Sequence, residues 1–234
     1  MNEILLFVRG PMFVFCFTFM VLGILRLLII MALNISASIR SSAGREFGQG
    51  ETYRELFSWS FSFTRLFNTA RIFSIISIIF HVGLIAVPLF LMEHINLWEN
   101  GTGMRWHHLP GDIADILTLA TIITGILLLL YRIGTESGRF ISSYPGYFLM
   151  IHIIFIFGSG YIASTAYNPI SYTGMMIWHV LAGNLLLLLI PYTRLSHAFI
   201  YPIVRVVTLT GWSFPYNGGR RVNKKIFGNE QIEI

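Results

Sequence analysis

The sequence contains a single cysteine, Cys16, and only 12% of its 234 residues are charged. One cysteine excludes a disulfide within the chain and a metal cluster held by several thiolates. There is no C-x-x-C-H stretch, which excludes haem attached covalently as in c-type cytochromes. Soluble domains carry about 25% charged residues, so the scarcity of charge argues against an ordinary soluble protein.

Hydrophobic residues make up 55% of the chain, and the mean hydropathy is +0.69. Five apolar stretches are long enough to cross about 30 Å of hydrocarbon as helices. They lie at about 11–33, 72–97, 112–132, 144–165 and 174–200. We therefore expect an all-α membrane protein, a bundle of five transmembrane helices in contact with the lipid bilayer.

Lysine and arginine residues gather in alternate connections between these stretches. Loop 35–70, the loop between the third and fourth stretches, and the tail are basic, whereas the opposite side holds Arg9 and Arg105. By the positive-inside rule, the N-terminus lies outside and the C-terminus lies in the cytoplasm. The net charge of +5 is therefore interpreted as a topology signal and not as a nucleic-acid-binding surface.

No internal repeat or low-complexity linker interrupts the chain, so residues 1–234 are interpreted as one domain. The first stretch lacks a basic leader and a small-residue cleavage site, which favours a retained helix over a signal peptide. Aromatic and charged residues at 51–71 fit either a helix at the membrane surface or a solvated connector. The tail at 201–234 is polar and short, and we expect it to contact a partner subunit.

Five of the seven histidines lie within or at the ends of the expected spans: His81, His94, His152, His179 and His197. An ionisable side chain inside a membrane is costly and often functional. For any one histidine alone, a neutral ring hydrogen-bonded to a neighbouring helix is the more common case. The functional hypothesis therefore depends on how the histidines are arranged.

The second and fifth stretches run in opposite directions and carry histidines at matching depths. His81 and His197 lie towards the inside, whereas His94 and His179 lie towards the outside. Two imidazoles on opposite sides of an iron suit a six-coordinate haem that transfers electrons. A zinc site would need three or four protein ligands, and two histidines at each depth fall short of that.

Helical geometry supports the two pairs unevenly. The 18 residues from His179 to His197 make five turns of an ideal helix, which places both on one face about 27 Å apart. The 13 residues from His81 to His94 would leave these two about 140° out of phase. A proline lies between the histidines of each helix and is able to bend or unwind it. Without such a bend, His94 is the weaker assignment.

Two segments, FHVGLIAVPLFLMEH at 80–94 and WHVLAGNLLLLLIPYTRLSHAFIYPIV at 178–204, closely resemble the haem b membrane subunit of respiratory nitrate reductase. This gamma-subunit family includes relatives in sulfite-reductase-associated and heterodisulfide-reductase complexes. The resemblance covers most of the chain, and its most specific part is the H…PYTRLSH spacing. Nitrate reductase members place the histidines of the second helix closer together, which favours a relative with another soluble partner.

The resemblance implies two b-type haems stacked across the cell inner (cytoplasmic) membrane. His94 and His179 would be the axial ligands of the outer haem iron, and His81 and His197 those of the inner one. Menaquinol would be oxidised near the outer haem, and electrons would pass to a cytoplasmic iron–sulfur or other redox subunit. The chain would then be the electron-transfer subunit of a quinol-dependent oxidoreductase complex, without activity of its own on the terminal substrate.

Other polar residues have a functional and a structural interpretation. Four arginines lie near the ends of the expected helices: Arg26, Arg194, Arg71 and Arg132. They would either pair with haem propionates or only anchor their helices. Glu93 is the first candidate for accepting a proton from quinol. Four further candidates are His107, His108, Asp112 and Asp115. They would otherwise be surface groups, and Asp112 would cap the third helix.

His152 has no partner at its expected depth. We interpret it as a hydrogen-bonded interior histidine, and the alternatives are a quinone pocket or a ligand in place of His94. A rival function for the whole chain is a membrane transporter or metal permease that uses intramembrane histidines, although no repeated pair of broken helices favours it. A purely structural anchor would leave the matched depths of four histidines unexplained.

Overall fold

The computed structural model describes residues 1–41, 71–165, 169–201 and 203–204. The predictions for loop 42–70 and for the tail from residue 205 onward lie outside the described residues. The elements in chain order are α1 (Asn2–Arg9), α2 (Pro11–Ser41), α5 (Arg71–Phe90), α6 (Met92–Thr102), α7 (Gly111–Gly134), α8 (Glu136–Ile141), α9 (Tyr144–Ser164), α10 (Tyr172–Leu189), η1 (Ile190–Tyr192) and η2 (Arg194–Ser196).

Within the described part of the chain, five helical segments are long and apolar enough to cross a membrane. They are Asn2–Ser36, Arg71–Phe90, Gly111–Gly134, Tyr144–Ser164 and Tyr172–Tyr192. The predicted all-helical fold with five candidate membrane spans is therefore confirmed. The first span begins earlier than expected, since α1 adds two helical turns before the interruption at Gly10.

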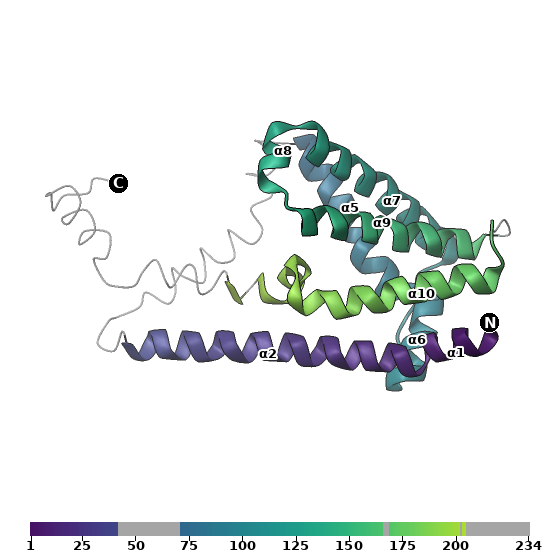
Figure 1. Ribbon diagram of the computed structural model, residues 1–234, viewed down its shortest axis with the longest axis horizontal. Coiled ribbons are helices and arrows are strands. Elements are labelled where there is room, and N and C mark those ends of the chain that lie inside the picture. Colours follow the sequence, from purple (N-terminus) through teal and green to yellow (C-terminus); the bar gives the residue numbers. More distant parts are fainter. Residues whose placement is uncertain (42–70, 166–168, 202, 205–234) are drawn as a thin grey trace, which may run out of the picture. The chain divides into compact units, whose positions relative to one another are not determined.

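The chain forms two compact units. The first consists of Met1–Val21 with Thr64–Arg194, and the second consists of Leu22–Phe63 with Leu195–Ile234. In the first unit, α7 packs against α5 and α9, α9 also packs against α10, and α10 contacts α1 (Figure 1). The interpretation of residues 1–234 as one domain stays a prediction.

Small residues allow α5 and α7 to approach closely. A Cβ atom added to Gly83 would collide with the Thr121 hydroxyl and would lie 3.0 Å from the carbonyl oxygen of Leu117. The Thr121 hydroxyl itself donates to that same carbonyl at 2.6 Å, which keeps its polar group satisfied inside the bundle. Close backbone contact through small residues is the usual way in which membrane helices associate.

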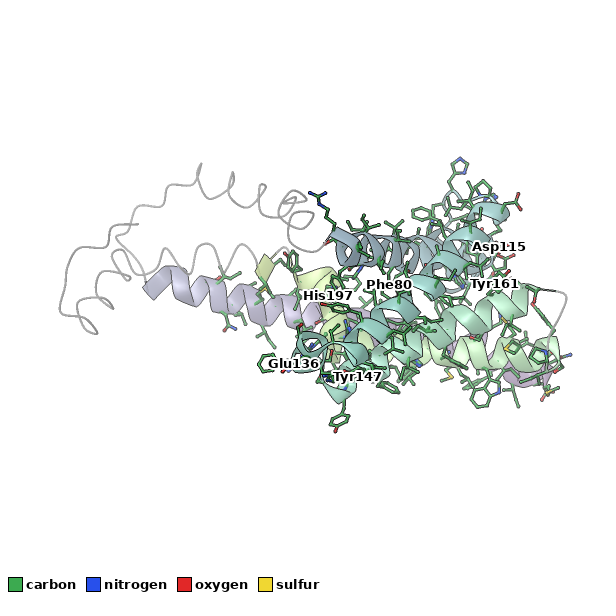
Figure 2. The ribbon with its side chains drawn as sticks, turned by 90° about the horizontal axis from the view of Figure 1, so that it is seen from above. Phe80, Asp115, Glu136, Tyr147, Tyr161 and His197 are labelled. Carbon is green, nitrogen blue, oxygen red and sulfur yellow. The ribbon has the colours of Figure 1, made fainter. Side chains whose placement is uncertain are left out.

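The short helix α8 connects α7 to α9, and side-chain hydrogen bonds stabilise this connection. The Thr135 hydroxyl accepts from the backbone N–H of Gly138 and caps α8, and the Tyr147 hydroxyl donates to the carbonyl oxygen of Arg132 at 3.1 Å. Figure 2 shows Glu136 and Tyr147 towards one end of these helices and Asp115 and Tyr161 towards the other. The helices α7 and α9 are therefore antiparallel neighbours.

The second predicted span is broken, contrary to the expectation of one helix over 72–97. The helix α5 ends at Phe90, Leu91 is extended with φ −72° and ψ 134°, and α6 begins at Met92. Pro88, inside the last turn of α5, lacks an N–H and crowds the preceding turn, which weakens the helix at this point. The expected bend is thus a complete interruption.

The last predicted span, 174–200, is also too long. The helix α10 ends at Leu189, and the short 3₁₀ turns η1 and η2 follow, with Thr193 extended between them. Pro191 lies in η1 and cannot supply the N–H that would continue the α-helix. The prediction that His179 and His197 share one face of a continuous helix is therefore wrong, and the spacing derived from it does not apply.

A buried asparagine links α10 to the end of α1. Asn184 is 1% exposed, and its Nδ2 donates to the carbonyl oxygen of Val8 at 2.9 Å. Val8 lies in the last turn of α1, where carbonyl groups lose their partners within the helix. In a membrane, such carbonyls need a donor from the protein, because lipid offers none.

Replacing Asn184 with leucine should lower the free energy of unfolding by about 1 kcal/mol, since interhelical hydrogen bonds in membranes average about 0.6 and reach about 1.7 kcal/mol. Unfolding in mixed micelles with increasing dodecyl sulfate, followed by circular dichroism, measures the change. Leu185→Ala is the control, because Leu185 is 41% exposed and exposed substitutions stay within about 0.5 kcal/mol. Equal stability of both variants would contradict the expectation.

Candidate functional site

Two of the predicted site residues lie side by side in the first unit. His94 is in the first turn of α6, and His179 is in α10. Their ring centroids are 6.0 Å apart, and the two ring planes are parallel within 4°. The structure thus brings together two histidines that the sequence predicts at the same depth, although they lie 85 positions apart in the chain.

The interruption at Leu91 gives His94 its position. An unbroken helix would leave His94 about 140° away from the direction of His81, whereas the extended Leu91 releases α6 from the phase of α5. The ring of His94 folds back towards α5, and its Nδ1 lies 3.4 Å from the carbonyl oxygen of Val87. The phase difference of about 140°, which assumes an unbroken helix, therefore does not apply to His94.

Donors from the following loop stabilise the same interruption. The indole Nε1 of Trp106 donates to the carbonyl oxygen of Leu89 at 2.6 Å, and the backbone N–H of Leu109 donates to the carbonyl oxygen of Phe90 at 2.9 Å. Carbonyl groups at a helix end need such external partners. Residues 106–109 thereby hold the C-terminal end of α5 and the start of α6 in place.

An aromatic cluster holds α6 against α2. The ring of Trp98, four residues after His94, packs edge-to-face on Phe13 at 5.5 Å and on Phe17 at 4.8 Å between centroids. Trp106 packs against Trp98 at 6.3 Å. Edge-to-face aromatic pairs add about 0.5–1.5 kcal/mol each beyond the burial of area. The short helix that carries His94 is therefore fixed on two sides.

The ring of His179 is held by α9. Its Nδ1 lies 3.0 Å from the carbonyl oxygen of Ile156 and 3.3 Å from the hydroxyl oxygen of Ser159. A Cβ atom added to Gly160 would lie 2.7 Å from Cε1 of His179, closer than carbon atoms approach without displacement. The absence of a side chain at Gly160 therefore makes the room that this imidazole occupies.

In both histidines the oxygen acceptors face Nδ1. This arrangement favours the tautomer that carries its proton on Nδ1 and leaves the lone pair on Nε2. Burial lowers the pKa of His94, so this ring stays neutral, which is the form that binds metal. The site therefore offers two neutral imidazoles whose Nε2 atoms are suited to coordination.

The distance between the ring centroids, 6.0 Å, leaves room for one metal ion between the two imidazoles. A metal–nitrogen bond is about 2 Å long and the ring centre lies about 1 Å further, which gives about 6 Å between centroids. The observed value is 6.0 Å. These two residues would hold a haem between their rings, and the haem would supply an iron for electron transfer. Their role as ligands stays a prediction.

His152 serves a different purpose. Its Nε2 lies 3.0 Å from the carbonyl oxygen of Ala182 in α10, and its ring stacks on Phe148 at 5.6 Å. The nitrogen that would bind a metal is engaged in a link between α9 and α10. This agrees with a hydrogen-bonded interior histidine, and it is His94 that the structure places beside His179.

The predicted inner pair involves both units. His81 in α5 has Nδ1 2.7 Å from the carbonyl oxygen of Ser77, and Phe80 packs edge-to-face on its ring at 5.5 Å. This ring too has its Nδ1 on a carbonyl oxygen. His197 belongs to the second unit and is exposed in the helical residues 197–201. The pairing of His81 with His197 stays a prediction.

The remaining candidates lie at the surface. Glu93, beside His94, is exposed, as are the other candidate groups His107, His108, Asp112, Asp115, Arg26 and Arg194. The helix α7 has Pro110 as its N-cap, so Asp112 lies in the first turn and the expectation that it caps the helix is wrong. Among the described residues, no group of three or more His, Cys, Asp or Glu side chains is arranged to hold a metal ion.

Three residues that contact the ring of His179 were not predicted from the sequence: Ile156, Ser159 and Gly160. The stretch GSG at 158–160 is the signal that was present, since small residues inside an apolar span mark a close approach of helices. The carbonyl group of Ile156 has no sequence signal, because every residue carries one.

The chain is distantly similar to a curated protein. A protein of Nitratidesulfovibrio vulgaris (strain Hildenborough), whose name, Protein, states no activity, is 30% identical over 129 residues. The match covers 55% of this chain and 56% of that protein, so the chain spans about half the length of the relative it matches. No family model matches the chain, and no solved structure matches it at a significant level. These comparisons show distant homology over about half of the chain.

Proposed function

We propose that this multi-pass membrane protein is a di-haem cytochrome b subunit that transfers electrons between menaquinol and a cytoplasmic redox partner. The observation that carries the proposal is the parallel pair of His94 and His179, 6.0 Å apart with both Nδ1 atoms turned to oxygen acceptors. The resemblance to the nitrate reductase gamma-subunit family supports the same function. The cell inner membrane is the corresponding location.

The residues have distinct tasks in this proposal. His94 and His179 hold the outer b-type haem, and His81 and His197 hold the inner one. A bound haem supplies an iron that gains and loses one electron. Arg26 and Arg194 pair with propionate groups. Glu93, exposed beside His94, accepts a proton from a quinol hydroxyl. An iron–sulfur or other redox subunit in the cytoplasm takes the electrons.

The decisive experiment is optical. The purified membrane protein, produced in cells with ample haem, should give a reduced-minus-oxidised spectrum of b type. Quantification as the pyridine haemochrome should give two haems per chain. A measured content of one haem per chain would support the site at His94 and His179 and would contradict the pair His81 and His197. A folded preparation without haem would overturn the proposed function.

A further inference from the structure

The two paired imidazoles are held differently at Nδ1. His179 has two oxygen atoms within reach, the Ile156 carbonyl at 3.0 Å and the Ser159 hydroxyl at 3.3 Å. His94 has the Val87 carbonyl at 3.4 Å, near the upper limit of a hydrogen bond. The stronger hydrogen bonding is thus on the α9 side of the pair.

Ser159 is built into this arrangement. Its side chain is 4% exposed, and its hydroxyl donates to the carbonyl oxygen of Ile156 at 3.0 Å. Because the hydroxyl proton is used in that bond, the oxygen lone pairs of Ser159 remain to accept the Nδ1 proton of His179. Ser159 and the Ile156 carbonyl therefore share one N–H donor, and the carbonyl group, which is an acceptor only, cannot bind a proton-free Nδ1.

We propose that Ser159 is a positioning residue for His179, which fixes its proton on Nδ1 and lowers the reduction potential of the haem that His179 holds. This inference rests on the proposed function. Donation of the Nδ1 proton to oxygen raises the basicity of the opposite nitrogen as a ligand. A more basic ligand stabilises the oxidised iron more than the reduced iron, and hydrogen bonding of this kind tunes the potential.

The structure offers a matched control in the same helix. The hydroxyl of Ser164 donates to the carbonyl oxygen of Tyr161 at 2.8 Å, three residues before it, as Ser159 does to Ile156. Ser164→Ala removes the same local bond from α9 at an exposed position. Ser159→Thr retains a hydroxyl, since threonine also bonds the preceding turn of a helix.

The test compares Ser159→Ala, Ser159→Thr and Ser164→Ala in the full-length, haem-loaded protein. Spectroelectrochemical titration gives the midpoint potential of each haem, and the low-spin ferric signal in electron paramagnetic resonance gives a second readout. We expect Ser159→Ala to raise one of the two potentials and to change one ferric signal. Ser159→Thr and Ser164→Ala should keep both potentials at the wild-type values.

Two results would overturn the inference and leave the proposed function intact. One is an unchanged pair of potentials in Ser159→Ala with both haems present. The other is an equal shift in Ser159→Thr and Ser159→Ala, because the hydroxyl would then not be the cause. Loss of one haem in Ser159→Ala alone, with Ser159→Thr loaded, supports the inference. Failure of the proposed function shows in the wild-type protein, which would contain no haem.

Discussion

Replacing His179 with alanine should remove one of the two haems that the proposed function assigns to each chain, while the bundle remains inserted. A six-coordinate iron that loses one axial imidazole loses half of its protein ligands, and His94 alone offers one nitrogen. His94→Ala should give the same result, because the two rings form one site, 6.0 Å apart. The pyridine haemochrome assay measures the change.

His152→Ala is the matched control for this prediction. His152 is also a half-buried histidine in a membrane span, but its Nε2 is bonded to the Ala182 carbonyl. We expect this variant to keep both haems. The assignment of the site would be wrong if His179→Ala retained two haems, or if His152→Ala lost one as His179→Ala does.

Replacing Gly160 with leucine should weaken the same haem without removing any ligand. A Cβ atom added to Gly160 would lie 2.7 Å from Cε1 of His179, so a larger side chain forces the imidazole or α9 to move. Overpacking costs about 1–3 kcal/mol, which corresponds to a loss of about 5- to 150-fold in haem affinity. Transfer of haem to apomyoglobin, followed over time, reports the weaker binding.

Gly158→Leu separates this effect from a general disturbance of α9. Gly158 lies two residues before Gly160 in the same helix, and a Cβ atom there meets nothing within 4 Å. The control variant should therefore release haem at the wild-type rate. Equal release from both variants would show that the room left by Gly160 does not matter for His179.

Much of the fold was predictable because its determinants are local in the chain. A run of about 20 apolar residues crosses a membrane only as a helix, since lipid offers no partner for free backbone groups. Five candidate spans are therefore present among the described residues, as expected, although two of them are shorter than predicted. The expectation that His94 and His179 lie near each other followed from the opposite directions of two helices, and the two rings are 6.0 Å apart.

The second and fifth spans, predicted at 72–97 and 174–200, are shorter than expected, and each contains a proline near the point where its helix ends. Pro88 and Pro191 mark weak points of their helices, but a proline inside a helix produces a kink, an interruption or a 3₁₀ turn according to its surroundings. At Leu91 the outcome is an interruption, because Trp106 and Leu109 supply donors to the carbonyl groups that are left open. These donors lie 15 and more residues away in the chain, beyond the reach of a local pattern.

The amino-acid sequence by itself determined the apolar character of this chain and the number of its candidate spans among the described residues, because the length of a hydrophobic run depends on neighbouring residues alone. Only the tertiary structure decided that His94 lies beside His179, that Gly160 leaves room for the imidazole and that Ser159 and Ile156 lie next to its Nδ1. These contacts join helices far apart in the chain, and a hydrogen bond of 3 Å exists only once those helices are packed.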